Sequence, residues 1–242
     1  MVARASRAEI DCDGRTSRDV NAALKRLIAA GERDVIVKNP GARHNLGVAV
    51  LQPAHVTFDG SVGYYCAGMI DGATVEIMGS AGWGVAESML DGTVIVHGSA
   101  GNGAAAAIRQ GTVVIHGAAA ARAGVSMKGG LVLIAGNCGY MAGFMAQKGT
   151  LIVCGDAGEA FADSMYDAVC YVGGRIADLG NDAVVHELTD EDVTFLAATL
   201  ARYLPAHGRG ATPPLSNFKK VVAGRKLWNF DKREWSTWRE AL

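Results

Sequence analysis

Two histidines and a cysteine occupy equivalent places in a repeating stretch, and they are the first candidates for chemistry. His97 and His116 are 19 residues apart, and the same interval leads through Ala135 to Cys154. Imidazole nitrogens and thiolate sulfurs are the ligands that zinc prefers. Because Ala135 interrupts the series, Cys154 would lie one repeat too far to complete a site. We therefore expect the two imidazoles to stack on adjacent turns of a repeat, and we predict no metal site.

A glycine-rich segment is the second candidate. Residues 101–106 read Gly-Asn-Gly-Ala-Ala-Ala and fit a loose dinucleotide-binding fingerprint. Such a loop binds pyrophosphate when it joins a strand to a helix and an acidic residue follows in the same unit. That context is missing, and the glycines belong to a repeat described below. The segment is therefore interpreted as structural, and we predict that this chain binds no cofactor.

The thiols and polar loops complete the search. The five cysteines are odd in number, widely spaced and without a Cys-x-x-Cys pair, so they indicate neither a disulfide framework nor a zinc ribbon: Cys12, Cys66, Cys138, Cys154 and Cys170. None has a base placed beside it as a nucleophile requires. The strings 39–45 and 163–166 are typical of turns. We predict no catalytic, cofactor-binding or metal-binding residues.

Composition limits the class of protein. The 242 residues are 50% hydrophobic, and 23 Lys and Arg stand against 24 Asp and Glu. Such a balance argues against a protein that covers nucleic acid or an acidic membrane. No apolar run approaches the ~20 residues that span a bilayer, and the first seven residues contain no apolar core of a signal peptide. We expect a cytoplasmic protein with reduced cysteines and no nucleic-acid or membrane partner.

Glycine recurs at a fixed interval along most of the chain. One series advances by 19 residues at every step: Gly41, Gly60, Gly79, Gly98, Gly117, Gly136, Gly155 and Gly174. Two further series share the interval, one at Gly92, Gly111, Gly130 and Gly149 and one at Gly63, Gly82, Gly101, Gly139 and Gly158, where Ala120 breaks the pattern. A fixed period of this length indicates a solenoid.

Apolar residues between the glycines alternate as half-buried strands require. Three columns are predicted to face inward: Val56, Val75, Val94, Val113, Val132 and Leu151; Phe58, Ile77, Val96, Ile115, Ile134, Val153 and Val172; and Ile70, Met89, Ile108, Met127, Ala146 and Met165. Coils stacked at ~4.8 Å place equivalent residues on one another, so seven coils span roughly 34 Å. Glycine is expected at corners that need positive φ or no side chain. A βα horseshoe is the alternative, but a repeat this short leaves little room for a helix.

The residue between the first two inward columns should face outward. This outer column reads Thr57, Glu76, Ile95, Val114, Leu133, Ile152 and Tyr171, so its last five members form an apolar stripe. A contiguous stripe of this kind is seldom left in water. Either a helix of the chain itself or a partner subunit is expected to cover it.

Helices are expected on both sides of the solenoid. Thr16 to Asp19 resembles a capping box that opens a helix over residues 17–30, and Thr189 to Asp192 opens another with apolar residues on one face. We divide the chain into residues 1–34, a strand and helix; residues 35–180, the solenoid; and residues 181–242, a helix, a linker and a basic tail with Trp228, Trp235 and Trp238. The tail is predicted to dock on a partner protein.

The repeated corners carry a family resemblance. The strings 61–69, 136–145 and 155–158 resemble the C-terminal GXGXG domain of the glutamate synthase large subunit, over about residues 8–185. The resemblance implies an all-β fold, a right-handed parallel β-helix of about seven 19-residue coils with flanking helices. It also implies a module that holds a glutaminase domain and a flavin and iron–sulfur synthase domain together without supplying catalytic side chains.

The strings 39–45 and 144–149 are more similar to the stand-alone β-helix subunit of the N-methylglutamate synthase family. This resemblance implies a structural subunit of a complex that converts methylamine and L-glutamate to N-methyl-L-glutamate and ammonia. A glutamine amidotransferase-like subunit and an FMN-binding synthase subunit are the expected partners, with FMN and an iron–sulfur cluster in a partner. The isolated chain is expected to be inactive.

Two alternatives remain beside this resemblance. Glutamate synthase is the close one, and a similar module occurs in formylmethanofuran dehydrogenase. A self-sufficient solenoid acyltransferase is the alternative of a different class. Its coils would consist of three hexapeptides, one residue shorter than the repeat of this chain, and it would expose a lone catalytic His.

Overall fold

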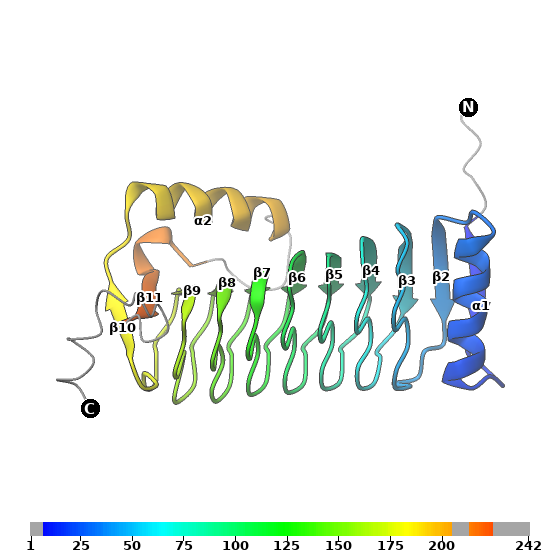
Figure 1. Cartoon of the computed structure of the whole chain (residues 1–242), viewed down its shortest axis with the longest axis horizontal. Coiled ribbons are helices and arrows are strands. Elements are labelled where there is room, and N and C mark those ends of the chain that lie inside the picture. The colour runs from blue at the N-terminus through cyan, green and yellow to red at the C-terminus, as the bar shows by residue number, and fades with distance from the viewer. Residues whose placement is uncertain (1–6, 205–212, 225–242) are drawn as a thin grey trace, which may run out of the picture.

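A parallel β-solenoid forms the body of the molecule (Figure 1). The computed structural model describes residues 7–204 and 213–224. One sheet contains all the named strands in the order β1-β2-β3-β4-β5-β6-β7-β8-β9-β11-β10, and β1 to β9 pair in parallel. The strands are β1 (Ala8–Asp11), β2 (Asp34–Lys38), β3 (His55–Asp59), β4 (Ala73–Ile77), β5 (Gly92–Val96), β6 (Thr112–Ile115), β7 (Lys128–Ile134), β8 (Lys148–Val153), β9 (Asp167–Val172), β10 (Ala183–His186) and β11 (Lys219–Ala223).

Equivalent residues stack in the predicted register from β3 onward. Val56 pairs with Val75 and Val75 with Val94, so each partner lies one repeat interval further along the chain. A second ladder of single bridges runs along the turns through Val62, Ala81, Ala100, Ala119, Cys138, Ala157 and Ile176. All three predicted inward columns are buried. The predicted β-helix is therefore confirmed.

The first coil departs from the regular interval. Val35 of β2 pairs with Val56 of β3, which is a longer step than the one that separates Val56 from Val75. The longer step places Lys38 opposite Asp59, and Gly60 lies against Pro40 instead of Gly41. The assignment of Gly41 to that series was therefore wrong, because equal sequence spacing does not guarantee equal register in a terminal coil.

The glycine columns have two different physical causes. Gly92, Gly111, Gly130 and Gly149 have φ angles of +121°, +81°, +74° and +105°, the conformation expected of a glycine corner. Gly98 has no positive φ, but a Cβ there would lie 2.8 Å from the carbonyl oxygen of Gly79 in the coil below. Glycine is needed in that column because the backbones of successive coils approach closely, not because the corner is left-handed.

A ladder of polar side chains joins successive coils beside this column. Ser61 Oγ accepts the backbone N–H of Ser80 at 3.0 Å. In the same way, Ser80 Oγ accepts the N–H of Ser99 at 3.1 Å, and Ser99 Oγ accepts the N–H of Ala118 at 3.2 Å. Asn137 and Asp156 continue the pattern at 2.8 and 2.7 Å. Ala118 has no side-chain oxygen, so the ladder is interrupted at one coil.

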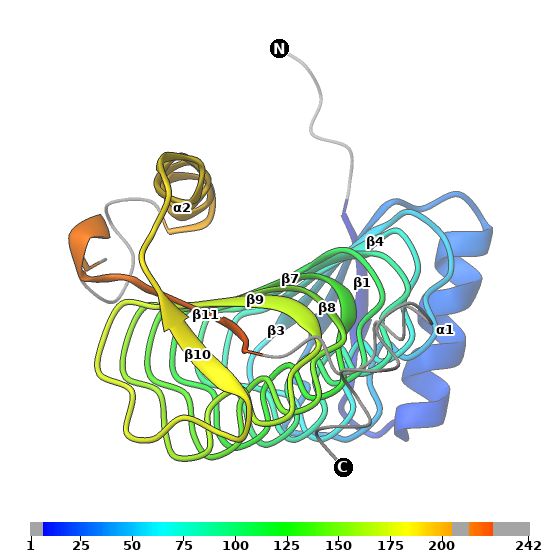
Figure 2. The same cartoon turned by 60° about the vertical axis from the view of Figure 1, so that its left-hand side comes forward.

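Both ends of the solenoid are covered by elements outside the repeat. Helix α1 (Ser17–Ala29) begins at Thr16 with the predicted capping box and packs Val20, Leu24 and Ile28 into the core at the β1–β2 end. Strand β11 pairs antiparallel with both β9 and β10 and extends the other end of the sheet (Figure 2). The predicted helix, linker and basic tail over residues 181–242 did not include this strand. Residues 225–242, with their three Trp, lie outside the described residues.

The outer apolar stripe is covered by the chain itself. Helix α2 (Asp190–Tyr203) begins with the second predicted capping box and runs along the sheet from β10 towards β6 (Figures 1 and 2). Val114, Leu133 and Ile152 are fully buried in a cluster with Leu196 and Leu200 of the helix. Phe218, which follows the short 3-10 helix Leu215–Asn217, completes this cluster.

Neither helix resembles a membrane span: within the described ranges, none is long and apolar enough to cross a bilayer.

Candidate functional site

His97 and His116 lie side by side on adjacent coils, as their spacing predicts, but their rings do not stack face to face. Their ring centroids are 5.0 Å apart, and the rings meet edge to face at 79°. Burial lowers the pKa of His116, and the neighbouring His97 lowers it further, while the backbone of Tyr203 at the end of α2 acts in the opposite direction. The structure groups no three His, Cys, Asp or Glu side chains for a metal among the residues it describes. Because His116 interacts with the backbone of Tyr203, the pair lies beneath the end of α2.

All five cysteines are buried free thiols. Burial raises the pKa of Cys138 and of Cys154 to about 12, and it also raises the pKa values of Cys12, Cys66 and Cys170. Because the thiolate is the reactive form, such thiols are poor nucleophiles and poor metal ligands. They serve as small apolar residues: Cys138 occupies the alanine column, and Cys170 continues the inward column after Leu151.

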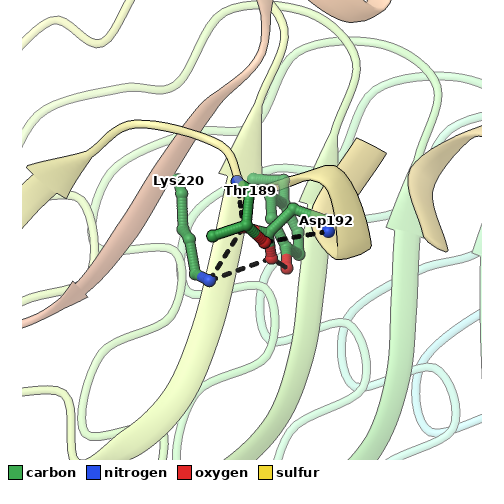
Figure 3. Close-up of polar contacts among 4 residues, drawn as sticks. Thr189, Asp192 and Lys220 are labelled. Carbon is green, nitrogen blue, oxygen red and sulfur yellow. Dashed lines mark hydrogen bonds and ion pairs between the residues drawn. The ribbon is translucent and has the colours of Figure 1, made fainter. Parts of the chain in front are cut away.

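A buried carboxylate, Asp192, forms the densest polar cluster of the described chain (Figure 3). Tyr171 Oη donates to Asp192 Oδ1 at 2.5 Å, and Lys220 Nζ lies 2.9 Å from both carboxylate oxygens. The backbone N–H and hydroxyl of Thr189 donate to Oδ2 at 2.8 and 2.9 Å. Burial alone would raise the pKa of Asp192, but these hydrogen bonds hold it well below its usual range.

This cluster acts as an anchor for the lateral helix. Tyr171 comes from β9, Lys220 from β11, and Thr189 with Asp192 from the start of α2, so one carboxylate joins three elements. Burial, followed by the hydrogen bond to Asp192, raises the pKa of Tyr171. Asp192 is only 6% exposed, and its oxygens are already bonded. A substrate therefore has no access to the group, and its chemistry is structural.

The polar loop strings are also satisfied within the chain. Arg43 donates to the carbonyl oxygens of Asn39 and Pro40 at 2.9 and 3.1 Å. Asp163 accepts from the backbone and side chain of Asn181 at 3.1 and 2.9 Å. In the segment that resembled a dinucleotide fingerprint, Asn102 Oδ1 accepts the N–H of Ala121 in the next coil at 3.1 Å. These residues hold turns against one another.

An exposed stack of aromatic rings is the feature that the sequence reasoning missed. The ring centroids of His44 and Tyr64 are 4.4 Å apart with an angle of 18°, and those of Tyr64 and Trp83 are 5.3 Å apart with an angle of 15°. Tyr64 is 47% and Trp83 54% exposed. The sequence carries a signal for this stack, because Tyr64 and Trp83 are one repeat interval apart. We call His44, Tyr64 and Trp83 the aromatic stack.

Comparison with known proteins identifies the family. The sequence model of the GXGXG motif family matches residues 26–219, from within α1 to the start of β11. The chain belongs to the GXGXG motif family. Among curated proteins, Protein GlxC of Rhizobium meliloti (strain 1021) is 48% identical over 216 residues, which cover 88% of this chain and 92% of GlxC.

As a GXGXG protein, the chain is related to the C-terminal domain of glutamate synthase. The glycines of the stacked corners lie within the matched residues, where they allow successive coils to approach closely. The match includes β8, β9 and α2, so the anchored lateral helix lies inside the family region. The chain is accordingly a subunit related to glutamate synthase.

Proposed function

We propose that this chain is the non-catalytic structural β-helix subunit of a flavin-dependent N-methylglutamate synthase. The complex converts methylamine and L-glutamate to N-methyl-L-glutamate and ammonia. The chain braces a glutamine amidotransferase-like subunit and an FMN-binding synthase subunit. FMN and the iron–sulfur cluster belong to a partner, and the complex works in the cytoplasm.

The observation that carries the proposal is a GXGXG solenoid whose polar groups are used for its own construction. Asp192 anchors a helix, His97 and His116 pack together, and the cysteine thiols are buried. What remains for function is a long, rigid body with exposed turns. Membership of the GXGXG family and the similarity to GlxC support a role within a glutamate-synthase-related complex.

Glutamate synthase itself is the close alternative, because its own C-terminal domain belongs to this family. A self-sufficient acyltransferase is disfavoured by the pairing of strands, since the observed repeat is one residue longer than a coil of three hexapeptides. The alternatives differ in substrate, so the activity of a purified complex separates them.

The test is to isolate the tagged chain from its native host and to identify and assay what accompanies it. We expect an amidotransferase-like protein and a flavoprotein in fixed ratio, and N-methylglutamate formation from methylamine and glutamate. Glutamate formation from glutamine and 2-oxoglutarate, with no reaction of methylamine, would instead assign the complex to glutamate synthase. Purification of the chain alone under conditions that preserve complexes would contradict the bracing role.

A further inference from the structure

The aromatic stack is exposed although the fold has no evident need for it there. Tyr64 and Trp83 leave about half of their surface exposed, and they lie on the β3–β4 and β4–β5 turns. Tyrosine and tryptophan are enriched in the cores of protein interfaces relative to ordinary surface. An exposed pair that also stacks therefore points to an interaction surface.

The stack is held rigidly by the coils. His44 Nδ1 accepts the backbone N–H of Tyr64 at 2.9 Å, which fixes the first ring. Trp83 covers the backbone of the next coil so closely that a Cβ on Gly101 would lie 2.5 Å from Trp83 Cδ1. Side chains that are already ordered lose little conformational entropy when a partner binds. The surface is thus preorganised.

The carboxylate of Glu87 lies against the turn that carries Trp83, near the ring of Tyr65. A Cβ on Gly84, the residue after Trp83, would lie 2.8 Å from Glu87 Oε2. Glu87 takes part in none of the ion pairs found within the described ranges. The site thus offers a carboxylate next to flat apolar groups.

A flat aromatic surface next to a carboxylate is complementary to the side chain of arginine. A guanidinium group is planar, stacks on aromatic rings and matches a carboxylate with two parallel N–H donors, whereas an ammonium group is a strongly hydrated point charge. We propose that the aromatic stack and Glu87 form a docking site for an arginine side chain of a partner subunit. The identity of that partner rests on the proposed function.

The test measures binding of the chain to the co-expressed amidotransferase-like and FMN synthase subunits by biolayer interferometry. Truncating a hot-spot residue of an interface costs at least about 2 kcal/mol, which corresponds to about a 30-fold increase in Kd. We expect this for Trp83→Ala and about a 10-fold increase for Glu87→Gln. Trp83→Phe, which keeps a ring for the guanidinium, should restore most of the affinity. The wild-type Kd should rise with salt more steeply than that of Glu87→Gln.

Tyr140→Ala is the matched control, because Tyr140 belongs to the same column three coils further on and is 49% exposed. Its Kd should change less than twofold. If the wild type assembles and both Trp83→Ala and Glu87→Gln bind equally well, the docking site is wrong and the proposed function stands. If the wild type binds neither subunit, both proposals fail. If Trp83→Ala lowers the melting temperature, its loss of binding reflects folding. The Kd values of Glu87→Gln and Trp83→Phe then decide whether the docking site is correct.

Discussion

Single residues determine how closely the coils stack, and the gap at Ala118 offers a test. Ser61, Ser80 and Ser99 each accept a backbone N–H from the next coil, whereas Ala118 cannot do so for Asn137. Ala118→Ser should therefore add one hydrogen bond. We expect roughly 0.5–1 kcal/mol of added stability, at the lower end of the usual range because the site is exposed. Thermal unfolding followed by circular dichroism measures it. Ser99→Ala is the matched control and should lower the stability. Equal melting temperatures for the parent, Ala118→Ser and Ser99→Ala would show that water fully replaces the hydrogen bond.

The stacked corner glycine gives the second prediction at this scale. Gly98→Ala should destabilise the protein by about 1–3 kcal/mol, because the new Cβ would meet the backbone of Gly79. Gly103→Ala is the comparison: its φ is +68° but its surroundings are open, so it carries only the cost of a left-handed alanine. In urea unfolding, the free energy of unfolding of Gly98→Ala should be lower than that of Gly103→Ala. The reverse order would mean that backbone conformation, not crowding, selects glycine at these corners.

At the scale of the element, the sequence predicted the features that depend on neighbouring residues, namely the helix starts and the inward-facing strand residues. Both helices begin at capping boxes that can be read directly, at Thr16 and Thr189, and the inward columns follow from a period of two within strands. Strand β11 has no counterpart in the repeat and pairs antiparallel, so its place depends on a long-range contact that no period reveals. The Asp192 anchor was missed for the same reason, since Tyr171, Asp192 and Lys220 are distant in sequence.

Because α2 covers the outer stripe, a charge placed in the stripe should destabilise the fold. Leu133→Lys should lower stability by about 3–5 kcal/mol, because it removes a fully buried side chain and places a charge beneath Leu196 and Leu200. Glu76→Lys is the control, at a position of the same outward column that is partly exposed. Its melting temperature should stay close to that of the parent. An unchanged melting temperature for Leu133→Lys would show that α2 leaves the sheet in solution.

At the scale of the whole molecule, the thiols, the buried carboxylate and the histidine pair of the described residues all pack within the body. The buried thiols have raised pKa values, the carboxylate with the most strongly lowered pKa is enclosed by Tyr171, Thr189 and Lys220, and the histidine pair lies in the wall below α2. Helices cover one end and one side of the solenoid and leave the turns with the aromatic stack exposed. This arrangement is the basis on which we propose a structural role for the chain.

The isolated chain should therefore be colourless and inactive. Expressed alone, it should show neither flavin nor iron–sulfur absorption, and it should form no N-methylglutamate from methylamine and glutamate. The physical reason is that catalysis needs an accessible nucleophile, acid or cofactor, whereas the strongly perturbed groups of the described chain are closed to solvent by packing or hydrogen bonds. Absorption spectra and chromatographic product analysis measure both properties, and adding the partner subunits supplies the positive control. Stoichiometric FMN on the purified chain, or turnover without partners, would place a reaction centre on this subunit and overturn its structural role.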